Sequence, residues 1–381
     1  MARPKKKQTP DKKRKEKRLY KIGHIVKLLN ITPRTIRYYD QFGLLPDVKR
    51  SEGGVRLFDE RDVQIIEKVR RMQREEFLPL DEIKRKIFGR SGEQARNKVV
   101  LVDSTAAIPE EIRTRLNIQV VPLRIEVAGK TYADDGSIST QDLWERSKGL
   151  SLPVQTLPPT EGDFIEAFEG LYKKGHNEIF AVLISPKLSM TMQNAQSAAH
   201  KVSDHIHVHC IDSGSTGAGL GLLAQVIAEA IDEDHATEQI TYLVKKNAPL
   251  VYDILTVNSL QFLLSEEINA NMPVNRLNLM KKFLSFKPVL RLLGGELEIL
   301  ECCKEKNQAL NLMLDHLQTE IRARGNYVKQ ITIIYNFLYG EAVELINHVK
   351  TLYRNTPIHM VQSSPIISAY VGPESIGISF I

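Results

Sequence analysis

The chain has 381 residues, 42% of them hydrophobic, so it is long enough for two or three compact domains with real cores. Its charge is uneven: residues 1–90 carry a net charge of +13 and the remaining residues carry −7. A basic front and an acidic back indicate a nucleic-acid-binding module joined to a module of another kind. No apolar run reaches the ~18–20 residues of a membrane span, and no signal peptide is visible, so we expect a cytoplasmic protein.

The cysteine and histidine patterns do not predict a metal site. The chain has three cysteines, Cys210, Cys302 and Cys303, and they form no C-x-x-C pair or other metal-ligand spacing. This pattern indicates a reducing compartment. The adjacent pair Cys302–Cys303 is interpreted as strand residues facing opposite sides, with a redox sensor as the alternative. Three alternating histidines are interpreted as the polar side of an edge strand, with a metal site as the less favoured alternative: His205, His207 and His209.

The first 18 residues form a strongly basic tail. They hold ten basic and two acidic side chains and show no apolar period. Because such a segment cannot repay the entropy of ordering itself, we predict that residues 1–18 are disordered. The tail would add a salt-dependent, non-specific attraction to DNA.

Two short helices are predicted next. Apolar residues recur with helical spacing between Tyr20 and Leu29, and residues 30–31 provide a tight turn before a second helix. Thr32 is expected to cap that helix through its hydroxyl, and Pro33 suits the first helical position because its missing N–H costs nothing there. A helix, a short turn and a second helix form the helix-turn-helix arrangement.

The second helix carries cations and phenols on one side. Arg34, Arg37 and Tyr38 are three and four residues apart and share a face that a short helix cannot bury. Such a face suits the phosphates and base edges of DNA. Of the two tyrosines, we expect one to pack in the core and the other to meet a phosphate. The candidate DNA-binding residues of this helix are Arg34, Thr35, Arg37, Tyr38 and Tyr39.

A wing is predicted after the second helix. Two strand-like pieces flank the turn at residues 51–54, where two glycines permit a hairpin. Asp59 is expected to cap a longer helix, and a shorter helical piece spans Leu80 to Phe88. The basic residues of the wing are placed to reach the DNA backbone: Lys49, Arg50 and Arg56.

The order and spacing of these residues are specific over roughly 70 positions. The pattern is carried by Gly23, Ile31-Thr32, Ile36-Arg37-Tyr38-Tyr39-Asp40, Gly43-Leu44-Leu45 and Gly54-Val55-Arg56-Leu57-Phe58. This segment resembles the MerR family of transcription regulators. The resemblance implies a winged helix-turn-helix domain, at residues 19–90, that binds a palindromic double-stranded operator as a homodimer. Family members continue into a long dimerisation helix, which residues 89–92 interrupt here, so the dimerisation surface stays open.

From Lys98 the pattern becomes that of a layered α/β sheet. Apolar runs at residues 99–102, 179–184 and 208–211 predict buried strands, and each leads through a polar turn into a helix. This repeat indicates parallel strands, whose carboxyl ends bind ligands beside helix N-termini. The hydroxyls at these ends suit an anion. Asp103 and Asp212 also lie there, and we expect them to cap turns rather than perform acid–base catalysis.

Further motifs are spread over about 280 residues of this module. They are Asp103-Ser104-Thr105, Val121-Pro122-Leu123, Thr156, Ser185-Pro186-Lys187-Leu188-Ser189-Met190-Thr191, Ile211-Asp212-Ser213, Leu284-Ser285-Phe286-Lys287-Pro288-Val289-Leu290 and Val371-Gly372-Pro373. Together they resemble the DegV family of bacterial fatty-acid-binding proteins. The resemblance implies two lobes, roughly residues 98–250 and 251–381, which hold a fatty acid's carboxylate through hydroxyls and its tail in an apolar tunnel. The ligand-binding residues that it implies are Thr156, Ser189, Thr191 and Tyr370.

Several positions depart from the family pattern. Met190 stands where the family has glycine, and Leu157 follows Thr156 where the family has serine. The family has a segment that contains an arginine, and residues 265–268 stand in its place here without the arginine. Tyr370 stands where the family has a histidine. In the family, this arginine and histidine help to present the head group to a partner kinase. Their replacement argues against a carrier role in fatty-acid phosphorylation.

We therefore expect an α/β protein with an N-terminal winged helix-turn-helix domain, a linker at residues 91–97 and a two-lobed DegV-like lipid-binding module at residues 98–381. The expected function is a transcription regulator whose large module binds a fatty acid or acyl lipid as effector, with no other cofactor and no metal. The alternative is a fatty-acid carrier with an autoregulatory DNA-binding domain. A third reading is a constitutive DNA binder whose large module only dimerises. An enzyme is the least supported reading, because no catalytic constellation appears in the sequence.

Overall fold

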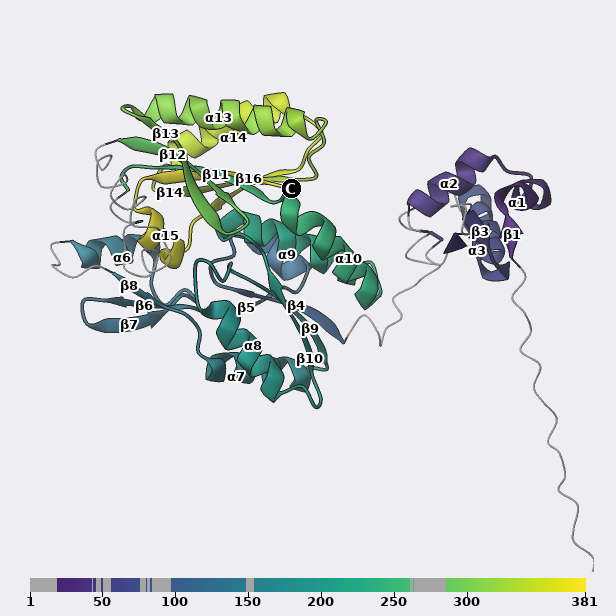
Figure 1. The fold of residues 1–381 in the computed structure, drawn as a ribbon, viewed down its shortest axis with the longest axis horizontal. Coiled ribbons are helices and arrows are strands. Elements are labelled where there is room, and N and C mark those ends of the chain that lie inside the picture. The colour runs from purple at the N-terminus through teal and green to yellow at the C-terminus, as the bar shows by residue number, and fades with distance from the viewer. Residues whose placement is uncertain are drawn as a thin grey trace, which may run out of the picture. The chain divides into compact units, whose positions relative to one another are not determined.

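A computed structural model describes residues 19–42, 44–45, 49–50, 56–75, 80, 83, 97–148, 154–260, 263 and 286–381. The chain divides into two compact units, Met1–Gly92 and Glu93–Ile381, which Figure 1 shows and which we describe separately. The predicted tail at residues 1–18 and most of the predicted linker lie outside the described residues.

The first unit contains the predicted helix-turn-helix. Its elements are β1 (Tyr20–Lys21), α1 (Ile22–Leu29), α2 (Pro33–Gln41), β2 (Lys49–Arg50), β3 (Arg56–Phe58) and α3 (Glu60–Glu75). The strands form a small antiparallel sheet in the order β1-β3-β2. The first helix begins two residues later than predicted, because Tyr20 and Lys21 pair with Phe58 and Leu57 of the wing.

Local sequence signals explain where these helices begin. The backbone N–H of Thr35 donates to Thr32 Oγ1 at 3.1 Å, so the predicted cap of α2 is confirmed. Asp59 Oδ1 accepts from the backbone N–H of Asp62 at 3.3 Å, which caps α3. Most fully buried side chains of this unit come from α1, α2, β3 and α3, among them Ile25, Ile36, Phe58 and Ile66. Leu44 and Ile83 complete the same core. Of the predicted helical piece at 80–88, only Leu80 and Ile83 are among the described residues.

The second unit begins with a parallel sheet in the strand order β10-β9-β4-β5. Its strands are β4 (Lys98–Asp103), β5 (Gln119–Val121), β9 (Glu178–Leu183) and β10 (His207–Asp212). Helices α7 (Glu161–Lys173) and α8 (Thr191–Lys201) pack against one face, and α9 (Gly217–Asp232) packs against the other. Figure 1 shows these layers. The predicted repeat of parallel strand, polar turn and helix is confirmed.

A second sheet has the order β13-β12-β11-β16-β14-β15 and is mostly antiparallel. Its strands are β11 (Tyr252–Val257), β12 (Lys287–Leu293), β13 (Glu296–Cys303), β14 (Ile331–Asn336), β15 (Ile358–Gln362) and β16 (Ser375–Phe380). Helices α13 (Lys306–Ala323) and α14 (Tyr339–Leu352) cover its outer face, as Figure 1 shows.

Helix α9 joins the two sheets. Fourteen of its 16 residues are buried, because it packs against β4 and β9 on one side and against β11, β14 and β16 on the other. A helix that is apolar on all sides belongs in the centre of a protein. Two neighbouring helices complete this region, α5 (Glu110–Arg115) and α10 (Thr237–Asn247).

A small antiparallel sheet connects the lobes at another point. It has the order β7-β6-β8 and consists of β6 (Arg124–Val127), β7 (Lys130–Ala133) and β8 (Gln155–Leu157), with α6 (Thr140–Ser147) beside it. Helix α15 (Pro365–Val371), which comes from the end of the chain, packs on this sheet and on α6. Ile366 of α15 is fully buried there, and Trp144 Nε1 of α6 donates to Ser368 Oγ at 2.6 Å.

Candidate functional site

The exposed face of α2 carries the predicted DNA-binding cations. Arg34 and Arg37 are exposed, and the Tyr38 side chain is 52% exposed beside them. Thr35 is half-buried, and its hydroxyl lies 2.8 Å from that of Thr32 at the cap. The arrangement therefore offers two guanidinium groups and one phenol at the surface of a single short helix.

Tyr39 has a different position from Tyr38. Its side chain is 3% exposed in the core of the first unit, and its hydroxyl donates to Gln73 Oε1 of α3 at 2.7 Å. Burial also raises the pKa of this phenol. We therefore correct the direct DNA contact predicted for Tyr39: this residue positions α2 on α3, while Tyr38 is the tyrosine that remains at the surface.

The wing is linked to α2 by an ion pair. Arg56 Nε of β3 donates to Asp40 Oδ2 of α2 at 2.5 Å, and both side chains are partly exposed. Strand β2 places Lys49 opposite Leu57 and Arg50 opposite Arg56. Arg56 therefore holds the wing against α2 in addition to adding positive charge. The turn predicted at residues 51–54 lies outside the described residues.

The four predicted ligand-binding residues form two hydroxyl pairs. Thr156 Oγ1 of β8 is hydrogen-bonded to the hydroxyl of Tyr370 on α15. Ser189 Oγ lies 2.9 Å from Thr191 Oγ1 and also accepts from the Thr191 backbone N–H at 3.3 Å, at the start of α8. Thr156 and Thr191 are buried, while Ser189 and Tyr370 are half-buried. Each pair can reorient its hydroxyl hydrogens toward an incoming anion.

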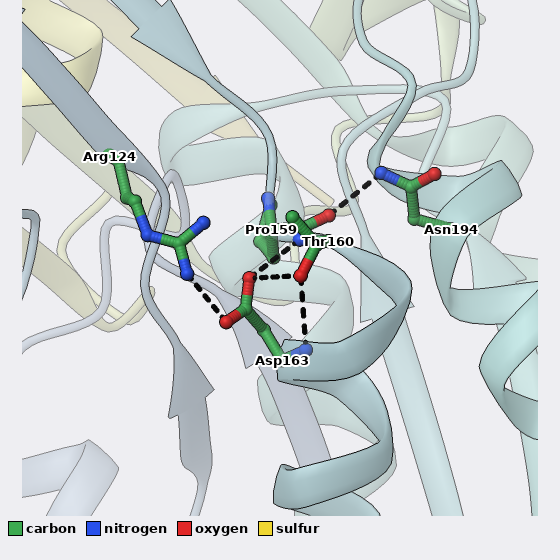
Figure 2. Close-up of polar contacts among 5 residues, drawn as sticks. All are labelled: Arg124, Pro159, Thr160, Asp163 and Asn194. Atoms are coloured by element: carbon green, nitrogen blue, oxygen red, sulfur yellow. Dashed lines mark hydrogen bonds and ion pairs between the residues drawn. The ribbon is translucent and has the colours of Figure 1, made fainter.

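A polar network fixes the segment after Thr156 against α8, as Figure 2 shows. Asn194 Nδ2 of α8 donates to the carbonyl oxygen of Pro159 at 2.8 Å. Thr160 caps α7 through a reciprocal pair of bonds with Asp163, and Asp163 also receives Arg124 Nη2 of β6 at 2.5 Å. These contacts connect β6, the residues that follow β8, α7 and α8, so they bring the two hydroxyl pairs into one region of the fold.

An apolar cavity of about 120 Å³ lies in the second unit. Aliphatic side chains make up most of its wall, and Tyr370 is the one predicted ligand residue that lines it. Thr156, Ser189 and Thr191 are not among its lining residues. Roughly 10–15 Å³ of such volume accommodates one water-sized group. The cavity therefore has room for several consecutive methylene groups of a chain. Its aliphatic lining residues include Leu188, Leu255, Leu292, Leu297, Ile334 and Ile376.

Asp253 is a buried acid on the wall of this cavity that sequence reasoning missed. Its carboxylate accepts from Ser215 Oγ at 2.6 Å, from Ser379 Oγ and from the backbone N–H of Gly219. Burial raises its pKa to about 6. An added Cβ at Gly219 would lie 2.4 Å from Asp253 Oδ1, so the carboxylate requires a glycine in the first turn of α9. The available signal was an aspartate within an otherwise apolar strand.

The other acids at strand ends cap turns as predicted. Asp103 is fully buried and accepts from the backbone N–H groups of Thr105 at 3.0 Å and Ile184 at 2.7 Å. Burial raises its pKa. Asp212 Oδ1 accepts from the backbone N–H of Gly214 at 2.7 Å. Both acids therefore hold loops at the carboxyl edge of the parallel sheet.

Two of the three alternating histidines lie beside separate glutamates. His205 Nε2 lies 2.9 Å from Glu169 Oε1, and His209 Nε2 lies 3.1 Å from Glu178 Oε1. Within the described residues, no group of three acidic, histidine or cysteine side chains has the arrangement of a metal site. Burial raises the pKa of the Cys210 thiol to about 11 and also raises those of Cys302 and Cys303, which disfavours the reactive thiolate that a redox sensor needs.

Comparison with known proteins identifies the larger unit. The family model described as an uncharacterised protein of the DegV family matches residues 98–381. The chain belongs to the DegV family. A second family model, described as a MerR HTH family regulatory protein, matches residues 20–87. No helix in the described part of the chain has the length and apolar content needed to cross a membrane.

The DegV match extends over nearly the whole length of its relatives. A DegV domain-containing protein of Staphylococcus aureus is 26% identical over 291 residues, which cover 74% of this chain and 97% of that protein. A fatty acid binding DegV family protein from Streptococcus agalactiae has a similar structure, with a TM-score of 0.66 at 18% identity, over 74% of this chain and 98% of that one. DegV from Bacillus subtilis, a fatty acid binding protein, gives a TM-score of 0.65 at 22% identity over the same shares. These structures establish the two-lobed α/β fold.

Proposed function

We propose that this protein is a DNA-binding transcription regulator whose DegV module binds a fatty acid or acyl lipid as its effector. The observation that carries the proposal is the combination, in one chain, of an exposed cationic helix face with an apolar cavity beside paired hydroxyls. The solved relatives described as fatty acid binding support the ligand class. Regulation of operator DNA would place the protein in the cytoplasm.

The ligand would span the polar region and the cavity. Tyr370 belongs to both, because its hydroxyl bonds to Thr156 and its ring lines the cavity. We assign the carboxylate to the hydroxyls of Thr156, Tyr370, Ser189 and Thr191, and the first part of the acyl chain to the aliphatic wall. Burial of the chain gains about 0.8 kcal/mol per CH₂, so about ten buried methylenes would contribute roughly 8 kcal/mol before the entropy cost of binding.

The DNA-binding unit would act through α2 and the wing. Arg34, Arg37 and Tyr38 would face the major groove, while Lys49 and Arg50 would contact the backbone. A palindromic operator requires two such heads, so we propose a homodimer. An effector changes operator binding only if it binds the two states of the dimer with different affinities.

Mass spectrometry of the intact, gently purified protein tests the ligand directly. We expect a co-purifying acyl species, and a rise in melting temperature when fatty acids of different chain lengths are added to the stripped protein. Failure to find either effect would contradict the effector role. Turnover of bound fatty acid by an acyl kinase would instead support the carrier alternative.

A further inference from the structure

Two hydroxyl groups on the cavity wall lack partners. Among the described residues, Thr216 Oγ1 and Ser363 Oγ are shielded from solvent and make no hydrogen bond. Both residues line the apolar cavity, and Ser363 is only 4% exposed. Buried polar groups in folded proteins nearly always find a partner, so these two require an explanation.

The two residues come from different lobes, and each lies near β14 on the wall of the same cavity. The backbone N–H of Ser363 donates to the carbonyl oxygen of Tyr335 at 2.8 Å. A Cβ built on Gly217, the residue after Thr216, would lie 3.6 Å from Ile334 Cδ1. Ile334 and Tyr335 are neighbours on β14, and both line the same cavity. The two unpartnered hydroxyls, which we call the polar spot, therefore lie on the largely aliphatic wall of one cavity.

This polar spot is unsuited to a carboxylate. Thr216 is the N-cap residue of α9, a position that would ordinarily attract an anion. The Asp253 carboxylate already lies against the first turn of α9, where it receives Ser215, Ser379 and the Gly219 N–H. Its pKa of about 6 leaves it mainly ionised at neutral pH. A second carboxylate beside it would be repelled in a medium of low dielectric constant.

We propose that Thr216 and Ser363 form a binding point for a neutral oxygen carried by the acyl chain of the ligand, a hydroxyl or a keto group. The effector class is therefore an oxygenated fatty acid rather than a plain one. This inference rests on the proposed function, because it presumes an acyl chain in the cavity. A serine or threonine hydroxyl can donate to a keto oxygen and can accept from a hydroxyl.

The position of the polar spot indicates an oxygen away from the carboxyl end. Ser363 precedes α15, whereas Tyr370 lies near the end of that helix. With a rise of 1.5 Å per residue, the backbones of the two residues are separated by roughly 10 Å. A carboxylate near Tyr370 and an oxygen near Ser363 would thus be several carbon atoms apart on one chain.

The single tryptophan provides a binding signal in the full-length protein. Trp144 is the only tryptophan in the chain, and its indole N–H donates to Ser368 of α15, the helix that carries Tyr370. Titrations of stearic acid, 12-hydroxystearic acid and 12-oxostearic acid can therefore be followed by its fluorescence and repeated by calorimetry. We expect at least one oxygenated acid to bind about tenfold more tightly than stearic acid.

Variants separate this inference from the proposed function. In the double variant Thr216→Val, Ser363→Ala, the oxygenated acids should bind about as tightly as stearic acid, and stearic acid should still bind. Ser203→Ala, which removes a surface hydroxyl bonded to the His200 carbonyl, should keep the preference and serves as the control. The inference alone would be overturned if the natural protein bound all three acids equally, or if the preference survived in the double variant. Buried water would then be the partner of the two hydroxyls. Binding of none of the acids would overturn the proposed function as well.

Discussion

The exposed face of α2 and the wall of the cavity use polar groups in opposite ways. On α2, Arg34 and Arg37 project into solvent, where charge costs little and is available to a polyanion. In the cavity, Asp253 and Ser363 are removed from water, so each polar atom affects stability and ligand choice strongly. Under the proposed function, α2 would provide affinity for DNA through charge, whereas the cavity would provide selectivity for its ligand through a few desolvated groups.

The pH dependence of stability should reveal the cost of the buried acid. Burial raises the pKa of Asp253 from 3.8 to about 6, so the folded protein holds this proton more tightly than the unfolded chain. The resulting stabilisation is fully present below pH 3.8 and is lost as the pH rises through about 6. The loss is of the order of 3 kcal/mol. Asp253→Asn should remove this part of the decline and leave the part that comes from Asp134, whose pKa burial also raises to about 6. Urea unfolding at several pH values would measure the difference.

A surface acid is the matched control for this experiment. Asp135 is exposed, and its pKa is lowered by hydrogen bonds from Ser137. Asp135→Asn should leave the Asp253 part of the decline between about pH 4 and 7 in place, and should alter only the part from its neighbour Asp134, whose pKa the Asp135 charge raises. If Asp253→Asn and the natural protein lose stability in parallel over that range, Asp253 is not the buried acid described here. Operator binding by Asp253→Asn should stay unchanged.

Loss of one guanidinium group on α2 should have the next largest effect. Arg37→Ala should weaken operator binding by about 1–3 kcal/mol if the side chain reads a base, or should weaken all DNA sequences alike if it touches only phosphate. Fluorescence anisotropy with specific and unrelated duplexes distinguishes these outcomes. Arg113→Ala removes an arginine paired with Glu110 on α5 and should leave DNA affinity unchanged. Normal operator binding by Arg37→Ala would remove α2 from the interface.

The cap of α7 tests whether the network of Figure 2 positions Thr156. Thr160→Ala removes the reciprocal bonds with Asp163 and should cost about 1 kcal/mol of stability. It should also weaken fatty-acid binding, because the Pro159 carbonyl that Asn194 contacts adjoins this cap. Ser139→Ala removes the equivalent cap of α6 and should cost similar stability. Equal ligand affinity in Thr160→Ala and the natural protein would show that the network is only structural.

The ion pair of the wing should have the smallest effect. Arg56→Ala breaks the ion pair with Asp40. Because both side chains of this pair are partly exposed, the loss should cost about 0.5 kcal/mol of stability. DNA affinity should fall less than in Arg37→Ala, because the Asp40 carboxylate already neutralises part of the Arg56 charge. Thermal unfolding of the fatty-acid-free protein measures the change in stability without a contribution from bound ligand. A larger loss of affinity than in Arg37→Ala would make Arg56 a primary DNA contact.

Sequence reasoning succeeded where a short stretch of chain determines the structure. The cap at Thr32, the common face of Arg34 and Arg37, and the repeated parallel strands all follow from spacing along the chain. It failed for Asp253, because its partners are far away in sequence: Ser379 lies opposite it on β16, and Ser215 comes from the other lobe. The burial of Tyr39 rather than Tyr38 likewise depends on the later helix α3, so the sequence left that choice open.

The most direct test of the account measures operator affinity of the full-length protein with and without bound fatty acid. An operator selected from a random duplex library supplies the DNA, and acids confirmed to bind the protein supply the effector. A saturating acid should change operator affinity by at least about fivefold, the lower end of ordinary allosteric coupling. Stoichiometric binding of the acid with no change in operator affinity would contradict it.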